Sequence, residues 1–348
     1  IKGEKDIQKI SRQTMSNKEI KEVPASFGDS LNALTALPGV SRPDGIFGPL
    51  VIRGADSANN GYFIDDIPIY NPMHFGVLHS VINNDLMKDI DLYESSFPSQ
   101  FGNAQAAIIN INTIDEVNEE GGSVDVGLVS SCVLVKTPIT ETVIINGKEK
   151  KENKGYIIAS GRLGYLSLFI PMFYEYVLND KFDQSFEYWD YQFKAKYYLN
   201  SSNSVTLLSF GSGDRLNLIL KDDYLEDGDD PYWTNAAWKQ NQQSHNVGLY
   251  YTFKPGESFS NTLMVYGAMT DYYMWEELPE ATATWAKDVG ITSKPYIFGL
   301  KDKVKTEWWK SHGELRAGVE FNYYRFMVNG CALMPGEGCD YIDPGDEE

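Results

Sequence analysis

The sequence predicts an α+β domain followed by antiparallel strands of a transmembrane β-barrel that is incomplete in this chain. Three observations predict this fold class. Aromatic residues number 9 in the first 113 residues and 37 in the remaining 235. Long runs of the second part alternate apolar and polar side chains, as half-exposed strands do. Short turns and long polar connections alternate between those runs, which is the layout of outer-membrane barrels.

Composition and charge exclude several classes of protein. The chain has 348 residues, 42% of them hydrophobic, which suffices to bury a core and excludes a disordered chain. Thirty basic against 49 acidic residues give a net charge of −19, so we expect no nucleic-acid partner. No apolar run reaches the length of a membrane helix, whereas alternating strands keep hydropathy low and leave a membrane barrel open. The chain starts at Ile1 without a signal peptide, so we expect a piece of a longer protein.

Residues 1–113 predict the small domain. Phe27, Leu31, Leu34 and Leu37 have helical spacing, with Ser26 as the expected N-cap and Pro38-Gly39 as the stop. Apolar runs bounded by turn-forming residues predict strands at 49–53, 62–69, 89–94 and 106–112. Basic residues are sparse and no glycine-rich phosphate loop occurs, so this is not a nucleotide-binding domain.

Residues 114–348 predict about nine strands, joined to the first domain by the acidic segment 115–122. In the clearest strand, Trp189, Tyr191 and Phe193 share one face and the polar residues between them share the other. A soluble antiparallel sandwich would also alternate. The turn asymmetry and the aromatic residues at presumed strand ends favour the membrane barrel instead. Nine strands cannot enclose a separate domain, so we expect further strands beyond this sequence.

The motifs of the first domain resemble the plug of TonB-dependent outer-membrane receptors. The segments Leu50–Gly54 and Tyr62–Tyr70 are similar to the family's Ile-Arg-Gly strand and to its apolar strand ending in Asp-Gly-x-Pro, with Asp66 in place of the Gly. Segments 89–94, 101–102 and 106–111 follow in the family's order. The resemblance covers about residues 20–113 and implies residues 1–113 as plug and 114–348 as the first strands of a barrel of about 22 strands.

The resemblance further implies uptake of a scarce nutrient of the siderophore, cobalamin, glycan or peptide class, in the outer membrane. A TonB-type protein would add a strand from the N-terminal segment to itself and pull on the plug. The family's TonB box is not evident and is expected before Ile1. Because such a plug must seal a wide lumen and still move, its contacts with the barrel are expected to be polar and wet.

The family pairs the Arg of its Ile-Arg-Gly strand with barrel carboxylates. This implies that Arg53 latches the plug to the wall, with Glu320 as the first choice of partner over Glu307 and Glu314. The alternative is an Arg53 that lies at the plug surface in water. Gln100 stands where the family often has a second Arg, so a second latch is expected to be weaker.

Two plug loops, at 41–48 and 70–79, are expected to face the extracellular mouth. Aromatic, amide and charged groups there suit a sugar, peptide or chelate ligand, and ordinary loop packing is the alternative. The candidate ligand-facing residues are Arg42, Asp44, Tyr70, Asn71, Met73, His74, Phe75 and His79. The i, i+5 spacing of the two histidines argues against a metal site.

Two further sites are expected outside the plug. Residues 222–230 hold six carboxylates, which fit no EF-hand but allow weak Ca²⁺ binding at Asp222, Asp223, Asp227, Asp229 and Asp230. A solvated surface loop is the alternative. Cys331 and Cys339 flank a short loop that a disulfide could close in an oxidising compartment, with two separate thiols as the alternative. No cofactor is otherwise expected.

No enzyme motif occurs in the sequence. There is no nucleophile elbow, His-Glu-x-x-His pair or phosphate loop. Asp65 and Asp66 are adjacent, so on a strand they would face opposite sides and could not act as an acid/base pair. The expected partners are a TonB-type protein, a nutrient ligand and outer-membrane lipid. The alternatives are a surface receptor or adhesin that moves no cargo, and a soluble β-rich binding module.

Overall fold

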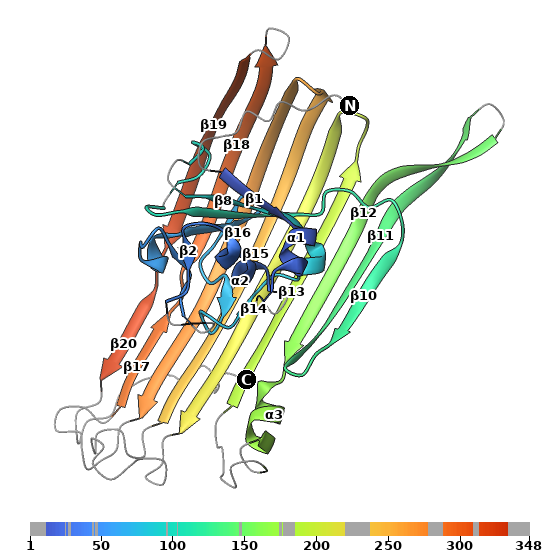
Figure 1. The fold of residues 1–348 in the computed structure, drawn as a ribbon. Coiled ribbons are helices and arrows are strands. Elements are labelled where there is room, and N and C mark those ends of the chain that lie inside the picture. Colours follow the sequence, from blue (N-terminus) through green and yellow to red (C-terminus); the bar gives the residue numbers. More distant parts are fainter. Residues whose placement is uncertain are drawn as a thin grey trace, which may run out of the picture.

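The fold comes from a computed structural model of the chain, shown in Figure 1. It describes residues 12–24, 26, 29–43, 45, 48–94, 97–102, 104–145, 148–173, 176, 185–219, 237–277, 288–308 and 313–332. A small domain of short elements lies against one face of a sheet of long strands, which we call the wall (Figure 1).

The small domain is built on a five-stranded sheet in the order β1-β8-β9-β4-β5. Only the β4–β9 pair is parallel. Two small hairpins, β2–β3 and β6–β7, lie outside this sheet. The strands are β1 (Arg12–Ser16), β2 (Val40–Ser41), β3 (Val51–Ile52), β4 (Gly61–Ile64), β5 (Ile67–Ile69), β6 (Met73–His74), β7 (His79–Ser80), β8 (Met87–Tyr93) and β9 (Ile108–Thr113).

Helices in the described ranges are short. They are α1 (Asn17–Glu22), α2 (Ser30–Ala33) and α3 (Leu166–Phe173), with 3-10 turns at Leu34–Ala36, Ser57–Asn59 and Asn84–Leu86. Asp29 caps α2 by accepting a hydrogen bond from the Asn32 N–H, so the prediction of Ser26 as the N-cap was wrong. None of the helices in these ranges is long and apolar enough to cross a membrane.

The predicted strand at 62–69 is a hairpin. Asp65 and Asp66 both have positive φ, 46° and 70°, and form the two-residue turn between β4 and β5. Positive φ at both central positions is the requirement of a type I′ hairpin turn, in which Asp is tolerated. The sequence had predicted these two carboxylates on opposite faces of a strand. That prediction was wrong, because both residues stand at a turn.

The wall contains eleven strands in a single antiparallel sheet. β16 pairs with β18 along one half and with β17 along the other, so β17 and β18 occupy one position, and β19 and β20 another. The strands are β10 (Gly121–Val126), β11 (Ser130–Ile145), β12 (Lys148–Gly164), β13 (Ser185–Tyr198), β14 (Asn203–Ile219), β15 (Ala237–Gly256), β16 (Phe259–Glu277), β17 (Asp288–Ser293), β18 (Tyr296–Trp308), β19 (Gly313–Arg325) and β20 (Val328–Ala332). The strands at its two edges, β10 and β19, do not pair with each other in the described residues, so the described sheet is not closed.

The wall buries its polar face and exposes its apolar face, which is the reverse of a sheet in a soluble protein. On β13 the polar residues Asp190, Gln192 and Lys194 are only 2–5% exposed, because the small domain covers their face. On the opposite face Leu249 and Phe321 are 50% and 61% exposed. A soluble sandwich would bury the apolar face, so this arrangement favours the membrane barrel.

One apolar cluster joins the small domain to the wall. It contains Ile67 and Ile69 of β5 together with Leu208, Tyr250 and Met264 of the wall. A Cβ added at Gly248 would lie 2.5 Å from Ile67 Cδ1, so this glycine leaves room for the isoleucine. The expectation that the contacts would be polar and wet was therefore wrong for this part of the interface, which is dry and apolar.

Candidate functional site

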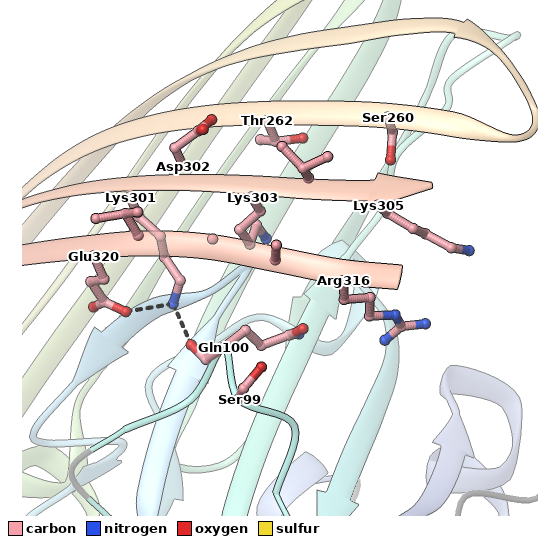
Figure 2. A pocket seen from close by; sticks show the side chains of 14 residues that line it. Ser99, Gln100, Ser260, Thr262, Lys301, Asp302, Lys303, Lys305, Arg316 and Glu320 are labelled. Carbon is pink, nitrogen blue, oxygen red and sulfur yellow. Dashed lines mark hydrogen bonds and ion pairs between the residues drawn. The ribbon is translucent and has the colours of Figure 1, made fainter. Parts of the chain in front are cut away.

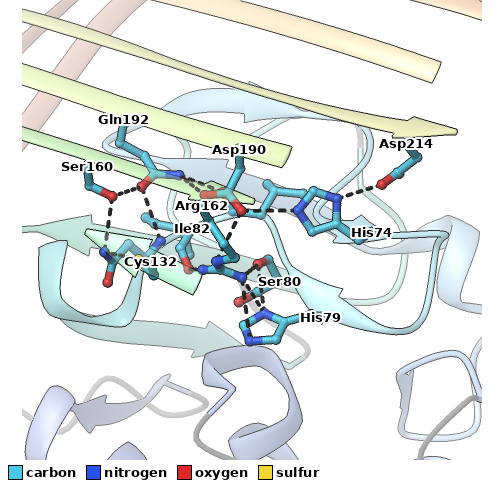
Figure 3. Close-up of polar contacts among 12 residues, drawn as sticks. His74, His79, Ser80, Ile82, Cys132, Ser160, Arg162, Asp190, Gln192 and Asp214 are labelled. Carbon is cyan, nitrogen blue, oxygen red and sulfur yellow. Dashed lines mark hydrogen bonds and ion pairs between the residues drawn. The ribbon is translucent and has the colours of Figure 1, made fainter. Parts of the chain in front are cut away.

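The most buried polar contact between the two parts is a bridge from His74 to two wall carboxylates (Figure 3). His74 lies in the β6–β7 hairpin, and its side chain is fully buried. His74 Nδ1 is 2.6 Å from Asp214 Oδ1 on β14, and Nε2 is 3.2 Å from Asp190 Oδ2 on β13. The Phe75 N–H also donates to Asp214. The hairpin is thereby fixed to two adjacent strands.

The geometry requires a charged His74. Ionised carboxylates only accept hydrogen bonds, so the ring must donate from both nitrogens, which only the imidazolium can do. Burial alone lowers the pKa of His74, but the hydrogen bonds to Asp190 and Asp214 outweigh it and raise this pKa above its usual value. The bridge is therefore an ion-paired contact between the charged ring and the two carboxylates.

Arg162 of β12 extends this cluster along the wall. Its guanidinium lies 3.2 Å from Asp190 Oδ2 and donates to the carbonyl oxygens of Ser80 and Ile82. It also lies 2.7 Å from His79 Nδ1, and the same nitrogen is 3.0 Å from Asp29 Oδ2. We call Asp29, His74, His79, Arg162, Asp190 and Asp214 the His74 cluster. It ties helix α2 and the β6–β7 hairpin to β12, β13 and β14.

Asp29 is the carboxylate that the small domain contributes to this cluster. Its side chain is buried, which by itself raises its pKa. Hydrogen bonds from His79, Ser80 and Asn32 outweigh burial and hold the pKa of Asp29 well below its usual range. Asp29 therefore stays ionised and caps α2 while it orients His79.

The β4–β5 turn makes a second contact. Lys194 on β13 donates to Asp65 Oδ2 at 2.9 Å and to the Thr113 hydroxyl. Tyr250 on β15 donates to the Asp65 carbonyl oxygen at 2.8 Å. Burial alone raises the pKa of Asp65, but the charge of Lys194 and the hydrogen bonds from Thr113 outweigh it and lower this pKa. Asp66, the other turn residue, pairs with Lys303 of β18.

A third contact borders a polar cavity of ≈ 390 Å³ between residues 99–100 and strands β16, β18 and β19. Lys301 donates to the Gln100 carbonyl oxygen and pairs with Glu320 Oε2 at 3.0 Å (Figure 2). The cavity lining also contains Lys303, Lys305 and Arg316. Each of these cations has a carboxylate partner, so the cavity is polar but locally balanced in charge.

The predicted Arg53–Glu320 latch is wrong. Arg53 lies 2.7 Å from Glu94 Oε2, a carboxylate of the same small domain. Its side chain is 54% exposed, and its φ of 52° places it in a turn after β3. Glu320 pairs instead with Lys301, and Lys301 also donates a hydrogen bond to the Gln100 carbonyl oxygen. The small domain is held to the wall by His74 and Asp65, whose partners lie far away in sequence.

The residues predicted to face a ligand divide into two groups. His74, Met73 and His79 are packed or bonded within the interface, so the structure contradicts that role for them. Arg42 also points inward, donating to the Val77 carbonyl and to the Met73 sulfur. Tyr70 is 58% exposed, and Asn71 and Phe75 are partly exposed. Asp44 lies outside the described residues.

The segment around Phe75 lies at the end of the wall that leads to the long connections. Its ring packs edge-on against Phe186 and Tyr188, near the first residue of β13. Residues 174–184 precede β13, and residues 220–236 follow β14. Tyr70, Asn71 and Phe75 are therefore the described members of the predicted set that keep exposed side-chain surface and lack a contradicting contact.

Two further predictions concern residues that the structure does not describe. Asp222, Asp223, Asp227, Asp229 and Asp230, the proposed Ca²⁺ ligands, lie outside the described residues, as does Cys339. The Ca²⁺ site and the disulfide therefore stay predictions. Within the described ranges, no group of three or more His, Cys, Asp or Glu side chains could hold a metal ion.

The wall partners of the interface were missed by sequence reasoning. Arg162, Asp190, Lys194 and Asp214 lie on the polar faces of β12, β13 and β14. The alternating pattern placed them on a polar face, but a polar face alone does not show which residue meets the small domain. A charged residue in the middle of such a strand, distant from any turn, is the signal that could have marked them.

One known protein family matches the small domain of this chain. The TonB-dependent receptor plug domain family matches residues 5–108. This range contains β1 to β7, all of β8 and the first residue of β9. No curated protein sequence matches the chain.

Solved structures show the same fold. BauA, the ferric preacinetobactin receptor from Acinetobacter baumannii, has a TM-score of 0.60 and 11% identity over 93% of this chain and 48% of its own. FpvA from Pseudomonas aeruginosa has a TM-score of 0.55 and 12% identity over 93% and 53%. The siderophore receptor PirA from A. baumannii has 0.54 and 13% over 91% and 48%. The chain therefore spans about half the length of these structures.

The fold is that of a small domain packed against the polar face of a sheet of long strands, as a plug packs inside a membrane barrel. Residues 5–108 match the plug domain family of the TonB-dependent receptors, and the wall that follows has the fold of part of a TonB-dependent receptor barrel. From here on, the small domain is called the plug. The outer membrane is the compartment of this family.

Proposed function

We propose that the full-length receptor takes up a scarce nutrient when a TonB-type protein pulls its plug away from the wall. The observation that carries the proposal is the His74 bridge, since it fixes the plug to β13 and β14 through charges that water can replace. An ion-paired contact of this kind holds firmly while dry and weakens once water enters. Such a seal suits a plug that must be both tight and movable.

The exposed residues near the long connections support ligand entry on that side. Tyr70, Asn71 and Phe75 flank His74 in sequence, so a ligand bound to them would act directly on the bridge. BauA is described as a ferric preacinetobactin receptor, and FpvA is described in an iron complex with a pyoverdine, so ferric siderophores are the class to test first. Cobalamin, glycans and peptides are the other classes. The proposal assigns no catalytic step to the chain.

The N-terminal strand supports the direction of pulling. β1 lies at the edge of the plug sheet and pairs only with β8 in the described structure. Arg12 pairs with Asp91 at 2.8 Å, and Thr14 donates to the same carboxylate. A TonB-type partner that takes up the segment before β1 by strand addition would therefore load the edge strand first. The rest of the plug would follow only when its contacts with the wall give way.

A native cysteine offers a direct test of plug movement. Asn83 of the plug lies against the wall, with its Nδ2 3.0 Å from Cys132 Sγ on β11. In the full-length receptor, Asn83→Cys would place two thiols together, and a mild oxidant would join them. We expect oxidation to abolish ligand uptake while ligand binding continues, and a reductant to restore uptake. Uptake that continues in the fully cross-linked receptor contradicts plug displacement.

Two controls separate the alternatives. Asn83→Ser lacks the second thiol, so oxidation should leave its uptake unchanged. Deletion of the TonB-type partner should abolish uptake by the wild-type receptor, and unchanged uptake would overturn the proposal. A receptor that binds its ligand, fails to pull down a TonB-type protein and never transports would be the alternative surface receptor or adhesin.

A further inference from the structure

Two lysines of the wall have their carboxylate partners on the plug and not on the wall itself. They are Lys194 of β13 and Lys303 of β18, which pair with Asp65 and Asp66 of the plug turn. In the part of the chain that the structure describes, neither lysine forms an ion pair with any other carboxylate. The plug, rather than the wall, therefore balances the charge of each lysine.

The neighbours of Lys303 show that this arrangement is particular to its position. Lys301, Lys303 and Lys305 follow one another along the inward face of β18 (Figure 2). Lys301 and Lys305 both pair with carboxylates of β19. Lys303 stands opposite Thr262 of β16 and Gly318 of β19, neither of which carries a charge. The wall thus supplies anions to the outer two lysines and leaves the middle one to the plug.

Lys194 stands between apolar neighbours of the wall. Its cross-strand neighbours are Ile158 of β12 and Leu208 of β14, and its side chain is only 7% exposed. A buried ammonium group needs a paired anion, because its removal from water is otherwise costly. Asp65 of the plug provides that anion, with its Oδ2 atom 2.9 Å from the lysine Nζ atom. When the turn withdraws, the described wall offers this lysine no carboxylate in its place.

The plug turn brings the two lysines to adjacent carboxylates. Asp65 and Asp66 are consecutive, and consecutive Cα atoms are about 3.8 Å apart, so a small molecule with two acidic groups suits the same two lysines. Tyr250 of β15, a strand that lies between β13 and β18 in the wall, donates its hydroxyl to the Asp65 carbonyl oxygen. We call Lys194, Tyr250 and Lys303, which all belong to the wall, the lysine site.

The lysine site lies beyond the His74 bridge for a ligand that enters from the long-connection side. Along β13, Asp190 of the bridge is nearer to the first residue of the strand, and Lys194 is four residues further toward the short turn. A ligand that passes once the plug has moved therefore meets the lysine site next. Ammonium and hydroxyl donors of this kind bind carboxylates and phosphates through charge-assisted hydrogen bonds.

We propose that the lysine site binds the acidic groups of the transported nutrient, and that the Asp65-Asp66 turn takes their place while the receptor is closed. The nutrient is then an anionic one that carries carboxylate or phosphate groups. This inference deepens the proposed function and rests on plug displacement, because the turn must withdraw before a nutrient reaches the lysines. An anionic nutrient gives the lysines the same kind of partner that the turn removes.

The first test vacates the site while the turn is kept. Asp65→Gly together with Asp66→Gly removes both carboxylates, and Gly-Gly suits a type I′ turn. The probe is succinate, which has two carboxylates, and succinamide, its uncharged diamide, is the comparison compound. Calorimetric titration of the purified full-length receptor at constant ionic strength measures binding. We expect the double-glycine variant to bind one succinate, and to bind succinamide at least about tenfold more weakly. The wild type should bind neither, because the turn fills its site.

Matched substitutions in the double-glycine variant identify the lysines. Lys194→Gln and Lys303→Gln should each weaken succinate binding about tenfold, equivalent to about 1.4 kcal/mol. Lys305→Gln removes a lysine from the same face of β18 whose partners belong to the wall, so it should leave succinate binding unchanged. Thermal unfolding shows whether each variant is folded. Failure of the folded double-glycine variant to bind succinate, or equal binding of the two compounds, would overturn the proposal.

The class of nutrient is tested by uptake into cells with and without the full-length receptor. Ferric citrate is the anionic probe, and ferrichrome, an uncharged chelate, is the comparison. Receptor-dependent uptake of ferric citrate that falls when Lys194→Gln and Lys303→Gln are combined supports the proposal. Receptor-dependent uptake of ferrichrome that is the same in this variant as in the wild type contradicts it. The succinate titration needs no transport, and the Asn83→Cys cross-link tests plug displacement separately, so failure of one is distinguishable from failure of the other.

Discussion

The plug and the wall bury opposite kinds of side chain. In the plug, Ile64, Ile90 and Leu92 are buried at 0–1% exposure inside its own sheet, as in any soluble domain. In the wall, Asp190 and Gln192 are the buried residues, and the apolar side chains face outward. The difference shows that the wall is built for lipid on one side and for a polar filler on the other.

The comparison also explains why the plug contacts are mixed. The polar face of the wall needs partners for its charges, and the plug supplies His74, Asp65 and backbone carbonyls. Where the wall instead presents Leu208, Tyr250 and Met264, the plug supplies Ile67. Each part of the interface therefore follows the side chains of the wall strand beneath it.

Loss of the His74 bridge should break the polar part of the interface most severely. His74→Gln leaves Asp190 and Asp214 buried without their cation, which typically costs about 3–5 kcal/mol. We expect faster amide hydrogen exchange of residues 72–80 in the full-length receptor, measured by mass spectrometry. The matched control is His245→Gln, which changes a histidine on the outward face. Unchanged exchange in His74→Gln would show that the bridge does not hold the hairpin.

The same variant tests the charge of the ring. The pKa of His74 is raised in the fold above its unfolded value of about 6.5. The stabilisation that the charged His74 ring gives to the fold is therefore complete below that pH, and it is lost as the pH rises through the pKa of His74 in the folded state. The charged groups that face the ring or its partners are Arg162, Asp190 and Asp214. Protection of residues 72–80 should fall with rising pH in the wild type, whereas His74→Gln should lack this step.

A charge placed in the apolar band on the outward face of the wall should destabilise the receptor in lipid. Leu249→Arg places a guanidinium in the apolar band of β15, where the expected destabilisation is about 2–4 kcal/mol. Gln243→Arg, on the same face of the same strand but beyond the apolar band, should cost about 0–1 kcal/mol. Guanidinium unfolding of the full-length receptor in lipid vesicles measures both. Equal effects at the two positions would contradict the assignment of this face to lipid.

The apolar contact of the interface should give the smallest effect. Gly248→Ala places a methyl group against Ile67 Cδ1, and overpacking of this kind costs about 1–3 kcal/mol. Ile67→Val removes the clashing atom, so the double variant should recover part of the loss. Hydrogen exchange of β5 measures this coupling as a double-mutant cycle. Strictly additive effects would show that the two residues do not touch.

Sequence patterns predicted the elements well where the signal was local. The alternation around Trp189 corresponds to β13, and the motif order before Thr113 matches the plug family. The hairpin at Asp65-Asp66 was predicted as one strand, because two Asp residues with positive φ are a weaker turn signal than Asn-Gly or Asp-Gly. Ser26 was predicted as the helix cap and Asp29 takes that place, because both residue types suit the position and the spacing alone does not separate them.

The site was predicted less well than the fold. The 70–79 loop was singled out for its histidines and aromatic residues, but as a ligand surface. His74 meets Asp190 and Asp214 across 116 and 140 residues of chain, and Arg53 finds Glu94 within its own domain. Family resemblance suggested the wrong latch, because an arginine that keeps its position in a motif can still bond to a nearer carboxylate.

The sequence alone determined the two domain types, the faces of the wall strands and the plug family, because period-two alternation and motif order are properties of neighbouring residues. Only the tertiary structure decided which polar residues of the wall meet the plug, and which glycine leaves room for an isoleucine of the plug. Such contacts depend on strand register and on the seating of one domain against another. A shift of one residue in register would exchange the two faces and replace every partner.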